Sequence, residues 1–179
     1  MKIGFIGLGI MGKPMAAHLL DAGHEVWGCN LSPVPQDLLD KGAKQASSPK
    51  EAAEAGDVII IMVPDTSDVE TVLFGQDGVA EGLSKGKIVV DMSSIAPVET
   101  KEFAKKINAL GCQYLDAPVS GGEVGAKNAT LTIMVGGEQA TFDAVKPLFD
   151  LMGKNITLVG GNGDGQTCKV ANQIIVALT

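Results

Sequence analysis

Residues 2–12 read KIGFIGLGIMG, and this stretch decides the fold. A short apolar strand pattern, Lys2–Ile6, leads directly into a G-x-G-x-x-G spacing and then into an amphipathic stretch. In that spacing Gly7 allows a tight turn, Gly9 lets a pyrophosphate approach the backbone, and Gly12 lets the next helix pack closely. The free N–H groups at the start of that helix would then meet the phosphates. The opening therefore predicts a dinucleotide-binding βα unit, with an ordinary glycine-rich turn as the alternative.

Beyond this unit, short apolar runs alternate with longer amphipathic stretches. The expected strands are Lys2–Ile6, Glu25–Cys29, Asp57–Met62, Lys87–Asp91, Gln113–Asp116, Leu131–Val135 and Ile156–Val159. The expected helices are Ile10–Ala22, Gln36–Lys41, Pro49–Ala55, Asp68–Phe74, Pro97–Leu110, Gln139–Leu151 and a last helix from Gly165. This alternation predicts an α/β fold, a doubly wound and mostly parallel Rossmann sheet with helices on both faces. Ligands of such sheets bind at the carboxyl ends of the strands.

Composition excludes several classes of function. The 179 residues carry 14 Lys plus Arg against 21 Asp plus Glu, a net charge of −7, so nucleic acid is not an expected partner. We see no signal peptide and no apolar run long enough for a membrane span, so we expect a cytoplasmic protein with no membrane partner. The cysteines Cys29, Cys112 and Cys168 are far apart, and His18 and His24 lack ligand partners, so no metal site is expected.

The residue after the second strand normally contacts the adenosine ribose. An acidic side chain there favours NAD, and a nearby Arg favours NADP. This chain has Asn30-Leu31-Ser32 at that position and contains no Arg. The sequence therefore predicts NAD(H) or NADP(H) and leaves the preference between them open. The alternative is that Asn30 serves only the turn.

A later segment, residues 116–122 (DAPVSGG), follows a strand and so lies at the carboxyl edge of the sheet. Ser120 offers a hydroxyl, while Gly121 and Gly122 expose backbone N–H groups without side chains in the way. This combination suits a small carboxylate. The alternative is a flexible loop.

A second segment, residues 163–173 (GDGQTCKVANQ), runs from glycines into a helix. Lys169 and Asn172 are three residues apart and share one helix face. Their apolar neighbours predict a largely buried helix, in which a lysine is unusual and suggests a function. The alternative is a solvated surface lysine.

Together these motifs resemble the 3-hydroxyisobutyrate dehydrogenase (β-hydroxyacid dehydrogenase) family. Phe5–Met15 is similar to its opening signature, Asp116–Gly122 to its substrate-binding loop and Gly165–Gln173 to its catalytic helix. Within the family, Asp91–Pro97 and Ala171–Leu178 look most like the 2-hydroxy-3-oxopropionate (tartronate semialdehyde) reductases.

The resemblance implies hydride transfer between a nicotinamide cofactor and a small carboxylic acid, most closely the reduction of tartronate semialdehyde to glycerate. Lys169 would be the acid/base, and Asn172 would position the substrate or the lysine. Ser120, Gly121 and Gly122 would hold the substrate carboxylate. The dinucleotide would contact Gly7, Leu8, Gly9, Ile10, Met11, Gly12, Asn30, Leu31, Ser32, Val63, Pro64, Ser93 and Ser94.

The resemblance also divides the chain. Residues 1–162 would form the NAD(P)-binding domain, and residues 163–179 would begin an interdomain helix. The family's all-helical second domain is not among the 179 residues, so we expect this segment alone to be inactive, and we expect a homo-oligomer.

Four alternatives stay open. One is a 3-hydroxyisobutyrate or other 3-hydroxyacid dehydrogenase, or a reductase of glyoxylate or succinic semialdehyde. Another is a relative of 6-phosphogluconate dehydrogenase, although no Arg is present to bind a phosphate. A third is an imine-reducing relative, although such relatives usually replace the lysine that this chain retains as Lys169. The last is a catalytically silent dinucleotide-binding module.

Overall fold

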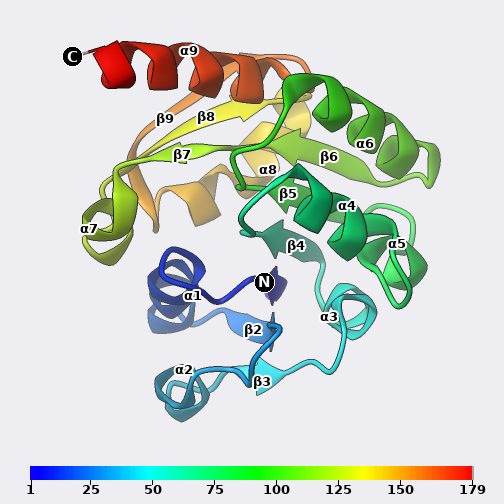
Figure 1. Ribbon diagram of the computed structural model, residues 1–179. Helices are drawn as coiled ribbons and strands as arrows, with labels where there is room; N and C mark the ends of the chain where they lie inside the picture. Colours follow the sequence, from blue (N-terminus) through cyan, green and yellow to red (C-terminus); the bar gives the residue numbers. More distant parts are fainter. Residues whose placement is uncertain (179) are drawn as a thin grey trace.

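Nine strands form one sheet in the computed structural model, which describes residues 1–178 (Figure 1). Its main part consists of parallel strands in the spatial order β3-β2-β1-β4-β5-β6. In that order they are Lys44–Gln45, Glu25–Cys29, Lys2–Ile6, Val58–Ile61, Ile88–Asp91 and Gln113–Asp116. The central β4 reads VIII and is buried throughout, as expected for a strand with helices on both faces. The doubly wound, mostly parallel Rossmann sheet is confirmed.

Helices pack on both faces of the sheet, and each face has its own hydrophobic core (Figure 1). One layer contains α1 (Gly12–Asp21), α2 (Gln36–Asp40) and α8 (Gln139–Phe149). The other contains α3 (Pro49–Ala55), α4 (Thr66–Phe74), α5 (Val79–Gly82) and α6 (Pro97–Ala109). Met15 and Phe149 lie in the first core, and Leu73 and Phe103 lie in the second.

The last three strands extend the sheet beyond its parallel part. After β6 the chain continues as β7 (Val119–Ser120) and α7 (Gly122–Lys127), and it returns antiparallel as β8 (Leu131–Gly136). β8 pairs with β6 only at Gly136 and Asp116, so β7 and most of β8 project past the carboxyl ends of the parallel strands. β9 (Gly153–Gly160) adds parallel to β8. We call β7, β8 and β9 the overhang.

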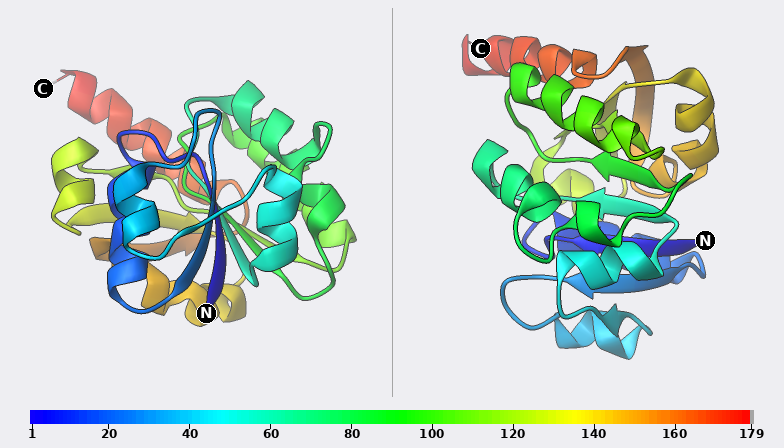
Figure 2. Two further views of the ribbon diagram at one scale, coloured as in Figure 1. Left: turned by 90° about the horizontal axis from the view of Figure 1, so that it is seen from below. Right: turned by 90° about the vertical axis from the view of Figure 1, so that its right-hand side faces the viewer.

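The last helix, α9 (Asp164–Leu178), runs along the overhang, and its far end projects from the body of the molecule (Figures 1 and 2). Only Gly165, Gln166 and Lys169 of this helix are buried. Its apolar residues Val170, Ile174, Ile175, Val176 and Leu178 are exposed. The expectation of a largely buried helix is therefore wrong for the described residues, because the sheet contacts only one side of α9.

Other differences from the expected elements are local. α1 begins at Gly12 rather than Ile10, because the preceding residues form the turn. β3, α5, β7 and α7 were not expected, and β9 begins earlier than expected, at Gly153. The flexible-loop alternative for residues 116–122 is wrong, since they contain the end of β6 and all of β7. No helix among residues 1–178 is long and apolar enough to cross a membrane.

Candidate functional site

The register of the parallel strands brings their carboxyl ends to one level. Ile6 pairs with both Cys29 and Ile61. Ile61 pairs in turn with Asp91, and Asp91 with Asp116. The loops that follow these strands therefore leave the sheet side by side. They carry the expected contact residues Gly7, Asn30, Val63 and Ser93.

The glycines of the first turn serve different purposes. Gly7 has a φ of 92°, and a Cβ there would lie 2.1 Å from the carbonyl oxygen of Met62. A Cβ on Gly12 would lie 1.9 Å from the carbonyl oxygen of Gly7, so only glycine lets α1 start this close to the turn. Gly9 is exposed, and a Cβ there would meet nothing within 4 Å. The N-cap residue Met11 makes no side-chain hydrogen bond. An open turn before an uncapped helix start fits the pyrophosphate of a dinucleotide.

Asn30 anchors this turn from the end of β2. Its Oδ1 accepts a hydrogen bond from the N–H of Leu8 at 3.2 Å, and its Nδ2 donates to Ser32 Oγ at 2.9 Å. Leu8 itself is buried in the core, so its backbone faces the turn, whereas Leu31 and Ile10 are exposed. Asn30 thus does more than form a turn, because it holds the glycine segment against β2.

The loops after β4 and β5 are joined by Ser93. This residue is fully buried, and its Oγ accepts a hydrogen bond from the N–H of Val63 at 3.0 Å. Its own N–H donates to Asp91 Oδ1 at 3.0 Å. Ser94 and Pro64 are exposed. Of the two serines, only Ser94 faces open space.

A cleft of about 510 Å³ lies between these loops and α9. We call it the Lys169 cleft. It is lined by Asp65, Thr66, Ser94, Ile95, Ala96, Gln166, Lys169, Val170, Gln173, Ile174 and Ala177. Its wall thus combines apolar and polar side chains with the amine of Lys169 and the carboxylate of Asp65.

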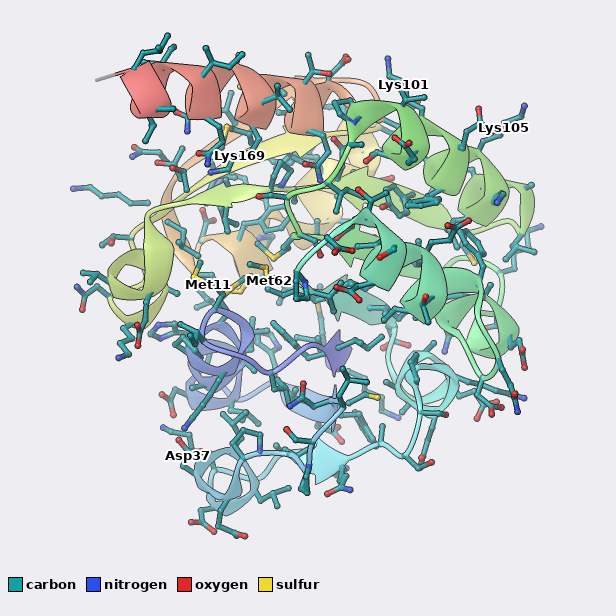
Figure 3. All side chains as sticks on the ribbon, in the orientation of Figure 1. Met11, Asp37, Met62, Lys101, Lys105 and Lys169 are labelled. Atoms are coloured by element: carbon teal, nitrogen blue, oxygen red, sulfur yellow. The ribbon has the colours of Figure 1, made fainter. Side chains whose placement is uncertain are left out.

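Lys169 extends from α9 toward the overhang (Figure 3). Only 8% of the residue is exposed, and burial lowers the pKa of its amine below the ordinary value. None of the ion pairs among residues 1–178 includes it, whereas surface lysines such as Lys127 and Lys146 pair with carboxylates one turn away. An amine in this state exchanges a proton more readily near neutral pH than a solvated lysine does.

Asp116 fixes the start of α9. Its two carboxylate oxygens accept hydrogen bonds from the N–H groups of Gly163 at 2.8 Å and Gln166 at 3.0 Å. A Cβ on Gly165 would lie 2.8 Å from Asp116 Oδ2, so a glycine is needed for this approach. Burial raises the pKa of Asp116, while these donated hydrogen bonds oppose the rise. Sequence reasoning gave Asp116 no role, although two adjacent buried strands ending in aspartate are a signal that could have found it.

The remaining expected site residues lie elsewhere. Ser120 is half-buried on β7, and Gly121 and Gly122 are exposed where α7 begins, with φ values of 134° and 58°. Asn172 is half-buried, and its Nδ2 donates to Gln173 Oε1 at 3.5 Å. The Lys169 cleft thus brings Lys169 together with Ser94, but it is lined by neither Asn172 nor residues 120–122. In the described part of the chain, no group of three or more His, Cys, Asp or Glu could hold a metal ion.

Comparison with known protein families shows which family this chain matches. Residues 2–161 match the family described as the NAD binding domain of 6-phosphogluconate dehydrogenase. The chain belongs to this family. Membership in this NAD-binding family confirms the nicotinamide dinucleotide as its cofactor and leaves the preference between NAD(H) and NADP(H) open.

The chain is similar to hydroxyacid dehydrogenases over nearly its whole length. It is 63% identical to 2-hydroxy-3-oxopropionate reductase of Escherichia coli (strain K12), covering 99% of this chain and 61% of that protein. It is 39% identical to mitochondrial 3-hydroxyisobutyrate dehydrogenase of Mus musculus, covering 99% and 53%. A solved structure of Mycobacterium tuberculosis 3-hydroxyisobutyrate dehydrogenase with L-serine superimposes with a TM-score of 0.92 at 36% identity, covering 98% and 60%. The resemblance seen in the sequence is confirmed, and the chain spans about 61% of the length of its Escherichia coli relative.

Proposed function

We propose that this protein transfers hydride between NAD(H) or NADP(H) and a small hydroxy or semialdehyde acid, with the reduction of tartronate semialdehyde to glycerate as its reaction. The observation that carries the proposal is the buried amine of Lys169, which has no ion-pair partner among residues 1–178 and lies in a cleft lined by the loops that follow β4 and β5. The 63% identity to 2-hydroxy-3-oxopropionate reductase supports the choice of substrate.

The parallel part of the sheet would bind the cofactor. The open turn at Gly9 and the start of α1 would bind the diphosphate, and the segment Asn30–Ser32 would lie beside the adenosine ribose. Val63 and Pro64 would line the groove, and Ser94 would face the nicotinamide. The bound cofactor supplies or accepts the hydride.

Lys169 would handle the proton. In reduction its protonated amine would donate to the oxygen on which negative charge develops, and in oxidation the neutral amine would accept the hydroxyl proton. General acid-base help of this kind is worth roughly 10²–10⁴-fold in rate. The lowered pKa of Lys169 makes both protonation states accessible nearer neutral pH.

The overhang would bind the substrate carboxylate through Ser120, Gly121 and Gly122, since the two glycines expose their backbone at the start of α7. We further propose that residues 163–179 begin an interdomain helix and that the protein is a homo-oligomer. The exposed apolar residues of α9 support both ideas, because such a surface is normally covered. Asn172 would then contact substrate or Lys169 in the assembled site.

A substrate panel tests the proposal. In the full-length protein, we would compare tartronate semialdehyde, succinic semialdehyde and glyoxylate with NADH and NADPH, and 3-hydroxyisobutyrate with NAD⁺ and NADP⁺. We expect the highest kcat/KM for tartronate semialdehyde, by about tenfold or more, a margin of roughly 1.4 kcal/mol in transition-state binding. A higher value for 3-hydroxyisobutyrate would reassign the substrate but keep the reaction class. Cofactor binding without any turnover would instead indicate a silent dinucleotide-binding module.

A further inference from the structure

Gln166 makes two hydrogen bonds to one short loop. It lies in the first turn of α9, three residues before Lys169, and its side chain is fully buried. Its Nε2 donates to the carbonyl oxygen of Ser93 at 2.7 Å, and its Oε1 accepts from the N–H of Ile95 at 3.1 Å. The amide therefore holds the backbone on both sides of Ser94.

The loop held in this way has no strand partner at this point. The side chain of Gln166 acts as a peptide unit would, with one donor and one acceptor facing a complementary pair. The rest of the loop is also fixed, because Thr66 Oγ1 accepts a hydrogen bond from the N–H of Ala96 at 3.2 Å, and Ser93 Oγ accepts from Val63. Ser94 is thus an exposed residue between clamped neighbours.

We call the two hydrogen bonds of Gln166 to Ser93 and Ile95 the clamp. The clamp fixes the positions of two residues that line the Lys169 cleft. Ser94 lies between the two hydrogen-bonded residues of the loop. Lys169 lies about one turn along the helix that carries Gln166. Asp116 holds the same turn of α9 through the backbone N–H of Gln166. The two sides of the cleft therefore meet at Gln166.

We propose that Gln166 is a positioning residue for the reaction: it fixes the loop that carries Ser94 relative to the helix that carries Lys169. The catalytic consequence rests on the proposed function, whereas the clamp itself does not. A displacement of about 1 Å between reacting groups lowers turnover by about 10²-fold, so a loosened clamp lowers kcat more than it weakens cofactor binding.

Two substitutions separate this role from simple packing. Gln166→Met keeps the volume and removes both hydrogen bonds. Gln166→Glu keeps both when its carboxyl is protonated, but the ionised form has no proton to donate to Ser93. The titratable and charged groups around this turn are Asp65 at the N-cap of α4, Asp91 on β5, Lys101 on α6, Tyr114 and Asp116 on β6, and Asp164 and Lys169 on α9. Burial among these mostly acidic groups favours the protonated form and raises the pKa of the new carboxyl.

The activity experiment uses the full-length protein and follows kcat and KM of the wild type and both variants from pH 5 to pH 9. Gln113→Met and Gln113→Glu serve as matched controls, because Gln113 is exposed at the start of β6. We expect Gln166→Met to lower kcat about 10²-fold while KM for the dinucleotide changes less than about threefold. The kcat ratio of Gln166→Glu to wild type should be near one at low pH and fall as pH rises through the pKa of the glutamate. A pH-independent ratio, or a Gln166→Met variant within about twofold of the wild type, would overturn the positioning role.

A second measurement does not depend on activity. Hydrogen exchange of the Ile95 amide should be slow in the wild type and much faster in Gln166→Met, while the β4 amide of Ile60 stays protected in both. Unchanged Ile95 exchange would refute the clamp. If the wild type reduces no semialdehyde, the proposed function fails, and Ile95 exchange still decides the clamp. If Gln166→Met does not fold, the same comparison is made within Gln166→Glu between low and high pH.

Discussion

Two glycines of the first turn lead to opposite predictions. Substitution of Gly9 should change cofactor affinity without lowering stability, and substitution of Gly12 should lower stability. Gly9→Ala adds a methyl group where nothing lies within 4 Å, at a backbone conformation outside the left-handed region. Its effect on folding is therefore neutral or stabilising by about 0.4–1 kcal/mol, through the unfolded state. The same methyl group fills the space that the pyrophosphate needs. We expect Kd for NADH and NADPH to rise by about tenfold or more, which corresponds to roughly 1.4 kcal/mol.

Gly12→Ala should behave in the opposite way. Its Cβ would lie 1.9 Å from the carbonyl oxygen of Gly7, a backbone atom, so α1 must move away from the turn by more than about 1 Å to reach ordinary contact. Overpacking of this kind costs about 1–3 kcal/mol. For a domain of this size that lowers Tm by roughly 2–12 °C.

The assay combines calorimetric titration with each dinucleotide and thermal unfolding without it. Gly161→Ala is the control, because a Cβ there also meets nothing within 4 Å and Gly161 lies outside the cofactor turn. This control should leave both Kd and Tm nearly unchanged. The reasoning is refuted if Gly9→Ala binds both dinucleotides like the wild type, or if Gly12→Ala is as stable as the control.

Other predictions concern buried ionisable groups. Lys169→Ala should lower kcat about 10²–10⁴-fold and leave dinucleotide Kd within about threefold, and a variant that keeps most of its kcat would exclude Lys169 as the acid. Because burial lowers the pKa of Lys169, the wild-type rate of reduction should fall as pH rises through that pKa while the rate of oxidation rises; pH profiles of kcat in both directions check this, and two profiles of the same slope would contradict it. Asp91, fully buried against the hydroxyl of Tyr114, has a pKa raised from 3.8 to about 6. Its ionisation is therefore favoured in the unfolded chain, and wild-type stability relative to Asp91→Asn should decline by about 3 kcal/mol as pH rises from about 4 to 7. Urea unfolding of both proteins at several pH values measures this decline, and parallel stability curves would be the contrary result.

How far the sequence predicts this structure depends on the range of the interactions. The glycine turn was predictable because strand, turn and helix lie within residues 2–21 and each glycine acts on its neighbours. The hydrogen-bond partners of Asp116 and Gln166 were not predictable, because the Gln166 N–H that binds Asp116 lies 50 residues away and the Ile95 N–H that binds Gln166 lies 71 residues away. The two-residue strand β7 has no periodicity of its own and exists through its pairing with β8.

The last helix, α9, shows a second reason why the sequence does not predict the whole structure. The apolar run in α9 correctly indicates a surface that would be favourable to cover. Composition alone does not say which element covers it, and the sheet contacts only one side of the helix. Lys169 was recognisable as unusual, but the helix that carries it begins at contacts with Asp116, which lies about 50 residues earlier in the chain.

The overhang has a consequence for how such proteins diversify. The chain passes from the parallel sheet to the overhang through Ala117 and Pro118, and the helices and strands after that point in residues 1–178 are β7, α7, β8, α8, β9 and α9. A crossover at this junction would replace the proposed acid and carboxylate-binding residues as one block and keep the dinucleotide half of the recipient. The incoming block must still share one hydrophobic core with the recipient and make the hydrogen bonds of Gln166 to Ser93 and Ile95. The His18 ring nitrogen, 2.9 Å from the carbonyl oxygen of Ala126, adds a further contact. Chimaeras that keep these contacts and the carboxylate of Asp116 should exchange substrate preference independently of the nicotinamide cofactor.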